Sequence, residues 1–178
     1  RKQALEMLRA RAAAIAPGEW VYTLGGWAIE QFADDKRPFT RDELDQAVPN
    51  NPVFLQASYR EAYLNSKGLE GMGIIESATP DAAIVRDAAG KPTGRILEAG
   101  FRQLVGKLPA ARGPEVEAST RVMIKDLNAM GLTAFGSAGC EADVLPTYRK
   151  LADQGQLNVR VGCISAPGGG GGVDQLLP

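Results

Sequence analysis

The sequence contains no histidine. Imidazole is a principal side-chain ligand of catalytic zinc, so this chain cannot assemble an imidazole-based metal site by itself. Cysteine is also scarce, because Cys140 and Cys163 are the only two in 178 residues. Two cysteines are too few for a disulfide framework, and we expect both to be free, buried thiols.

Long apolar runs and an excess of charge are missing as well. No hydrophobic stretch approaches the roughly 18 residues that a membrane-spanning helix needs. The 20 Lys and Arg residues nearly balance the 21 Asp and Glu residues, which gives a net charge of -1. Without a basic surface, the chain has no electrostatic basis for binding nucleic acid or an anionic membrane. We therefore expect a soluble protein, cytoplasmic or exported, that binds neither.

The rest of the composition is that of an ordinary globular protein, with 44% hydrophobic and 23% charged residues. A chain of 178 residues can bury one good core, or one domain with an appendage. The sequence starts at Arg1 inside a helical pattern and stops at Pro178 after a run of glycines. We expect it to be an interior piece of a longer polypeptide.

Residues 1–113 alternate between helical and strand patterns. Apolar residues recur at spacings of three and four over 1–16, which predicts an amphipathic helix. Thr40 stands three residues before Glu43, the spacing of a capping box at the start of a helix. Asn65 or Ser66 is suited to cap the helix that follows. Further helices are predicted over 27–33, 40–48, 67–73 and 95–107, and strands over 19–26, 52–58 and on both sides of Gly90.

Residues 114–178 have a different pattern. A helix is predicted over 114–130, followed by a strand over 132–139, a helix over 142–155 and a strand over 158–165. A strand–helix–strand unit of about 30 residues indicates that its two strands are parallel. A closed eight-stranded barrel takes about 250 residues, so this chain cannot complete one.

Six blocks of the sequence carry a resemblance when taken together and in order. They are EWVYTLGGW, FTRDELDQAVPNNPVFL, YLNSKGLEGMGI, VRDAAGKPTGRILEAG, LNAMGLTAFGSAG and YRKLADQGQLNVRV. In this order they resemble the amidohydrolase 3 group of metal-dependent hydrolases. That group includes N-substituted formamide deformylases and proteins labelled exoenzyme regulators. The resemblance covers about residues 1–165, nearly the whole chain.

The resemblance implies an α/β fold that belongs to an incomplete TIM-barrel-type metal-dependent hydrolase. Residues 1–113 would form an inserted α/β subdomain, and 114–178 a partial barrel segment with its early strands. The full-length protein would cleave non-peptide C–N bonds of small amide-type substrates, using one or two divalent metals, with zinc expected. The metal would polarise the carbonyl and supply hydroxide. The family's metal ligands would lie mostly upstream of Arg1 and downstream of Pro178, so this chain alone is expected to bind no metal and to be inactive.

The sequence departs from the family pattern at two places. Tyr59-Arg60 stands where the family has Gly-His, so a fixed cation that only donates replaces a neutral imidazole. Ser137 stands where the family has an Asp. Both departures imply a divergent branch, with another substrate or with reduced activity.

Glu98 is the candidate metal ligand within the chain. It matches the family's Gly-x-Leu-x-Glu position, where a bridging carboxylate would face the metal. Two structural explanations stand beside this role. Glu98 could be a first-turn residue favoured by the helix dipole, or it could pair with Arg95 three residues earlier on the predicted helix.

Arg60, Asn65, Ser66 and Trp27 are the candidate substrate-binding residues. Arg60, with Asn65 and Ser66, could line the mouth of an active site and bind a carboxylate or amide group. The alternative is a charged loop followed by a helix cap, and we expect Asn65 and Ser66 to be caps first. Trp27 follows two glycines and could cover the substrate, or it could be a core aromatic residue.

Two other classes of function remain open. The chain could be a non-catalytic binding or regulatory module that keeps the amidohydrolase-like fold, or an unrelated small α/β binding domain. Histidines in the flanking sequence would favour the enzyme. The expected partners are a small amide-type substrate and the remainder of the same polypeptide. A piece of a barrel exposes an apolar edge, so self-association is also expected.

Overall fold

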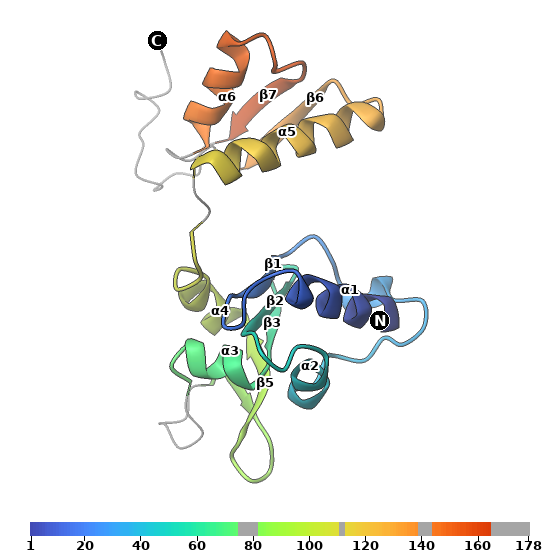
Figure 1. The fold of residues 1–178 in the computed structure, drawn as a ribbon, viewed down its shortest axis with the longest axis vertical. Helices are drawn as coiled ribbons and strands as arrows, with labels where there is room; N and C mark the ends of the chain where they lie inside the picture. Colours follow the sequence, from blue (N-terminus) through green and yellow to red (C-terminus); the bar gives the residue numbers. More distant parts are fainter. Residues whose placement is uncertain (75–81, 111–112, 139–143, 165–178) are drawn as a thin grey trace. The chain divides into compact units, whose positions relative to one another are not determined.

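A computed structural model describes residues 1–74, 82–110, 113–138 and 144–164 of the chain. The chain divides into two compact units, Arg1–Pro109 and Ala110–Pro178 (Figure 1). Each unit combines helices with a β-sheet, so the expected α/β class is confirmed. That the first unit is an inserted subdomain and the second a barrel segment remains a prediction.

The first unit is built on a five-stranded sheet in the order β1-β2-β3-β5-β4. β1 runs parallel to β2, and the other three pairings are antiparallel. β2 and β3 are almost entirely buried, which is consistent with their central places in the sheet. The strands are β1 (Val21–Leu24), β2 (Val53–Ala57), β3 (Glu61–Leu64), β4 (Ile84–Arg86) and β5 (Pro92–Leu97).

Helices cover both faces of this sheet. Successive strand residues point to opposite faces, so Phe54 and Leu55 of β2 belong to different cores. Leu55 packs in a core with residues of α1 and α2, whereas Phe54 packs in a core with residues of α3 and α4. The helices of this unit are α1 (Lys2–Ala13), the short 3-10 helix η1 (Ile29–Gln31), α2 (Arg41–Ala47), α3 (Ser66–Gly71) and α4 (Glu98–Val105).

The predicted caps are confirmed at two helices. At α2, the Thr40 hydroxyl accepts from the Glu43 backbone N–H, and the Glu43 carboxylate accepts from the Thr40 backbone N–H. At α3, the Asn65 side chain accepts from the backbone N–H of Gly68. Both caps satisfy N–H groups that lack a partner within their helix.

Three predictions in the first unit are corrected. The helix expected over 95–107 begins only at Glu98, because Ile96 and Leu97 belong to β5. Arg95 therefore lies on a strand, and the expected pairing with Glu98 along one helix is wrong. The helix expected over 27–33 is reduced to η1. Strand β3, whose four residues lie directly before the Asn65 cap, was not among the predicted elements.

The second unit contains the predicted strand–helix–strand arrangement. β6 (Ala134–Ala138) and β7 (Arg160–Ile164) pair in parallel, from Ala134 opposite Arg160 to Ala138 opposite Ile164. Helices α5 (Gly113–Ala129) and α6 (Leu145–Asp153) accompany them. The buried hydrophobic core of the second unit is formed by Ile124, Leu151 and Val159.

The cysteine prediction is wrong for Cys163. This residue is exposed on β7 and takes part in a disulfide. Cys140, also expected to be a free thiol, lies outside the described residues. Among the described helices, none has both the length and the apolar character needed to cross a bilayer.

Candidate functional site

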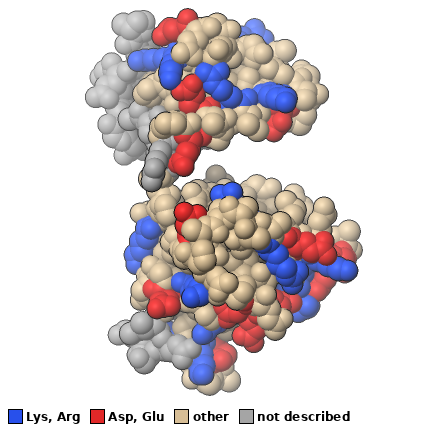
Figure 2. All heavy atoms as spheres, viewed as in Figure 1, with Lys and Arg blue, Asp and Glu red and all other residues tan. Residues whose placement is uncertain are grey.

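A surface pocket of about 590 Å³ lies in the first unit, where α2 and the start of α3 meet the β4–β5 hairpin. Three cationic and three anionic side chains line it, so their formal charges cancel. Both signs of charge also alternate over the visible face of each unit (Figure 2). The lining residues are Pro38, Phe39, Thr40, Arg41, Asp42, Asp45, Ser66, Val85, Asp87, Lys91, Pro92, Thr93 and Arg95.

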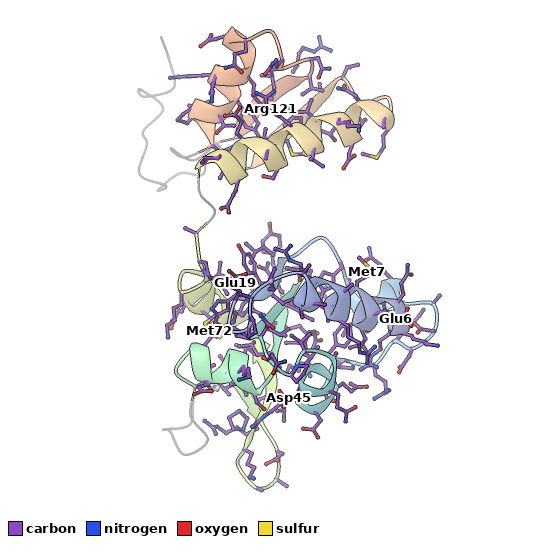
Figure 3. The ribbon with its side chains drawn as sticks, in the orientation of Figure 1. Glu6, Met7, Glu19, Asp45, Met72 and Arg121 are labelled. Atoms are coloured by element: carbon purple, nitrogen blue, oxygen red, sulfur yellow. The ribbon has the colours of Figure 1, made fainter. Side chains whose placement is uncertain are left out.

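A network of hydrogen bonds fixes one wall of this pocket. Arg41 Nε donates to Ser66 Oγ at 2.7 Å, and Arg41 Nη1 donates to the Pro92 carbonyl at 3.3 Å. Ser66 donates to both carboxylate oxygens of Asp45, from its backbone N–H at 2.8 Å and from its hydroxyl at 2.6 Å. α2 is thereby tied to the first turn of α3 and to β5. Figure 3 shows Asp45 at α2, beside the hairpin.

A second network holds Arg95 in place. Its Nε donates to Glu61 Oε2 at 2.5 Å, and the other Glu61 oxygen accepts from the Tyr63 hydroxyl. Arg95 and Tyr63 are register partners across β5 and β3. Burial, followed by the contact with Glu61, holds the pKa of the Tyr63 phenol well above its ordinary value. Tyr63 thus stays protonated near neutral pH and acts as the donor to Glu61.

Asn65 is fully buried and uses all its hydrogen-bonding capacity inside the protein. Its Oδ1 accepts from the backbone N–H groups of Val53 and Gly68. Its Nδ2 donates to the carbonyls of Val48 and Asn51. The expected structural role is therefore confirmed for Asn65, which joins β2, the end of α2 and the start of α3.

The remaining candidate substrate residues fall into two places. Ser66 lines the pocket, whereas Arg60 and Trp27 do not. Arg60 lies on the exposed loop between β2 and β3, and the backbone N–H of Ser58 in that loop donates to the Trp27 carbonyl at 3.1 Å. The structure thus brings Trp27 and the Arg60 loop together.

Trp27 is half-buried and belongs to an aromatic cluster. Its ring centroid lies 5.8 Å from those of Phe32 and Phe39 and 6.2 Å from that of Tyr63. Its indole N–H donates to Thr23 Oγ1 at 3.2 Å. The ring therefore packs over the core that β1 and β3 share with α1 and α2.

The described residues do not fit a metal centre. Glu98 is the exposed first residue of α4, and nowhere in the described ranges do three or more Cys, Asp or Glu side chains cluster in a way that could hold an ion. A divalent metal bound by Glu98 would need its other ligands from outside these ranges. The metal role of Glu98 remains a prediction.

Apart from Ser66, the residues that shape the pocket were not among the predicted site residues. Arg41 and Asp45 are four residues apart after a predicted cap, a spacing that places them on one face of α2. That signal was available in the sequence. Glu61 and Arg95 meet only because β3 pairs with β5, and this pairing could not be inferred because no strand was predicted over 61–64.

The chain is similar in sequence to known amidohydrolases. The amidohydrolase family model matches residues 1–176. The chain is similar to N-substituted formamide deformylase of Arthrobacter pascens, with 33% identity over 87% of this chain and 30% of that protein. It is also similar to YtcJ of Bacillus subtilis strain 168, named as an amidohydrolase, with 31% identity over 88% of this chain and 31% of that protein.

A solved structure shares the fold. It is an uncharacterized metal-dependent hydrolase from Pyrococcus horikoshii OT3, with a TM-score of 0.57 and 20% sequence identity. The match covers 90% of this chain and 31% of that one. The chain thus spans about a third of the length of the relatives that it matches.

Proposed function

The chain belongs to the amidohydrolase family, and on that premise we propose that it is part of a metal-dependent hydrolase acting on a small molecule. The bond cleaved is a non-peptide C–N bond of the amide type. The observation that carries this proposal is the family match over residues 1–176. The 33% identity to a protein named as an N-substituted formamide deformylase supports the choice of bond.

In this proposal the chain supplies substrate-lining elements and the rest of the polypeptide supplies the metal site. The chain has no histidine, and its described residues form no metal-binding cluster. The divalent metal, which we propose to be zinc, would therefore be held mainly by ligands outside residues 1–178. The chain by itself would bind no metal and would be inactive. Glu98 is the one residue proposed to reach the metal from this chain.

The exposed loop of Arg60 and the neighbouring Trp27 are the proposed substrate contacts. A guanidinium on a loop, with no hydrogen bond or ion pair to the described residues, can donate to the carbonyl or carboxylate oxygen of a substrate. Trp27 fixes the position of this loop through the bond from Ser58. Asn65 supports the site from within the core. Ser66, the first residue of α3, contributes from the pocket between α2 and the β4–β5 hairpin.

The second unit is proposed to be a segment of a TIM barrel. Its two parallel strands form a sheet on their own within the described residues, and parallel sheets are normally larger and covered on both faces. Neighbouring strands supplied by the rest of the polypeptide would complete it. Separated from these neighbours, the chain should self-associate through its exposed strand edges.

To test this proposal, hydrolysis of amide substrates by the full-length protein is measured in parallel with the metal content of that protein. Metal-loaded protein should cleave N-substituted formamides or related amides, lose this activity with chelator and regain it with zinc. Peptides and carboxylic esters are the matched comparison substrates. The proposal fails if metal-replete protein cleaves none of the amides, or if activity is unchanged when the metal is stripped.

A non-catalytic binding or regulatory module is the second candidate. Arg60, which stands where the resemblance to the family implies a histidine, favours this candidate. This alternative predicts that full-length protein binds an amide-type ligand in equilibrium dialysis but releases no product. Turnover of the same ligand would exclude it.

A further inference from the structure

We propose that the pocket between α2 and the β4–β5 hairpin binds a small monocarboxylate with an apolar body, and that Arg95 is the principal donor to its carboxylate. Of the residues proposed to contact substrate or metal, the pocket contains only Ser66, whose hydroxyl is already bonded to Arg41 and Asp45, so this inference does not depend on the hydrolase proposal. A volume of about 590 Å³ suits a small organic molecule rather than an ion alone.

Arg95 is an oriented cation with unused donors. Its Nε is bonded to Glu61, while its two Nη groups make no hydrogen bond or ion pair with the described residues. The side chain of Glu61 is only 14% exposed and is bonded in turn to Tyr63, which is 0% exposed. The guanidinium plane is thus fixed before any ligand arrives, which limits the entropy lost on binding.

The remaining polar groups of the pocket are mostly occupied. Arg41, Ser66 and Asp45 bond one another, and Asp87 accepts from the backbone N–H groups of the hairpin turn. The Lys91 ammonium and the Asp42 carboxylate make no ion pair with the described residues. The Lys91 ammonium and the two Nη groups of Arg95 are therefore the cationic donors available to a ligand, in a lining whose formal charges cancel.

The charges of the lining favour a carboxylate over a phosphate. The three Asp side chains repel any anion, and they repel a ligand with one negative charge less than a phosphate dianion. The planar Nη pair of Arg95 matches the two oxygens of a carboxylate. The apolar body of the ligand would contact Pro38, Phe39, Val85 and Pro92, which also line the pocket.

The first test is chemical protection in the full-length protein. Phenylglyoxal modifies arginines, and the modified peptides are quantified by mass spectrometry. Saturating benzoate should slow modification of Arg95 by about tenfold through site occupancy. Arg37, an exposed arginine in surface ion pairs of the same unit, is the internal control and should be unaffected. Benzamide, which lacks the carboxylate, should protect neither.

The second test is binding of benzoate in equilibrium dialysis. Arg95→Gln should abolish saturable binding, and Arg95→Lys should weaken it by about tenfold because an ammonium lacks the planar fork. Lys91→Met leaves the Glu61 contact intact and should weaken binding by a few-fold. Arg37→Gln should bind like the parent.

Several results would overturn the proposal. One is that phenylglyoxal fails to modify Arg95 in the ligand-free protein. Another is that benzoate fails to slow the modification of Arg95. Protection by phosphate at lower concentration than by benzoate would reject the carboxylate assignment. If Arg95→Gln does not fold, two other measurements decide. Unchanged benzoate binding by Lys91→Met, together with no protection of Arg95 by benzoate in the parent protein, would reject the proposal. None of these readouts requires hydrolysis, so they stand or fail separately from the proposed activity.

Discussion

Ser66 donates two hydrogen bonds to the carboxylate of Asp45, one from its backbone N–H at 2.8 Å and one from its hydroxyl at 2.6 Å. Both groups are partly buried, so the pair is shielded from competing water. The backbone N–H belongs to the first residue of α3, where N–H groups lack partners within the helix. A side chain of α2 thus completes the N-terminus of α3 and fixes the angle between the two helices at the pocket.

Breaking this contact should destabilise the protein by an amount typical of a charged hydrogen bond. Asp45→Asn should lower the free energy of unfolding by about 1–3 kcal/mol, because the amide cannot accept both bonds. Ser66→Ala removes only the hydroxyl, and the two substitutions together should cost less than their sum. Urea denaturation measures all three. Asp42→Asn, exposed on the same helix, is the matched control, and an equal loss there would contradict the assignment.

Among the polar residues of the first unit, we expect substitution of Asn65 to lower the free energy of unfolding most. Asn65→Ala leaves two buried N–H groups and two buried carbonyls without their partner, so we expect a loss of about 3 kcal/mol or more, or failure to fold. Asn65→Asp should be similarly damaging, since a carboxylate cannot donate to the carbonyls of Val48 and Asn51. Soluble yield and urea denaturation are the measurements.

The neighbouring Asn50 provides the control for Asn65. Its side chain is exposed and makes no hydrogen bond with the described residues, so Asn50→Ala should change the unfolding free energy by less than about 0.5 kcal/mol. A mild effect of Asn65→Ala, similar to that of Asn50→Ala, would show that the four buried bonds are not formed.

Gly94 permits a close approach of β5 to the end of β3. Its φ of +88° disfavours any other residue, and a Cβ there would lie 2.3 Å from the Leu64 carbonyl oxygen. Gly94→Ala should therefore cost clearly more than Gly90→Ala, which has a similar φ of +79° but open space around it. For Gly90→Ala we expect about 1–2 kcal/mol from the backbone alone. Equal losses for both in urea denaturation would contradict the predicted steric clash.

The sequence predicted most of the elements but not the pocket. Thr40, Glu43 and Asn65 carry local signals, because a cap depends only on residues three or four positions away. The parallel pairing of β6 and β7 followed from the length of their connection. By contrast, Glu61 and Arg95 are 34 residues apart, and their ion pair depends on strand register. Contacts of this kind have no local signature, so the Tyr63–Glu61–Arg95 network could not have been predicted.

The Glu43 carboxylate stabilises the fold in a way that depends on pH. The Arg1 guanidinium, followed by the Thr40 cap, holds the pKa of the Glu43 carboxyl at about 2, below its ordinary value of 4.5. Since the native pKa is the lower one, the unfolded chain binds the proton first as pH falls. The stabilisation is complete above about pH 5 and disappears as pH falls towards 2. The unfolding free energy of Glu43→Gln should consequently decline less steeply across this range than that of the parent or of Glu6→Gln, an exposed control on α1. Parallel pH profiles for all three proteins would mean that Arg1 and Glu43 do not interact in solution.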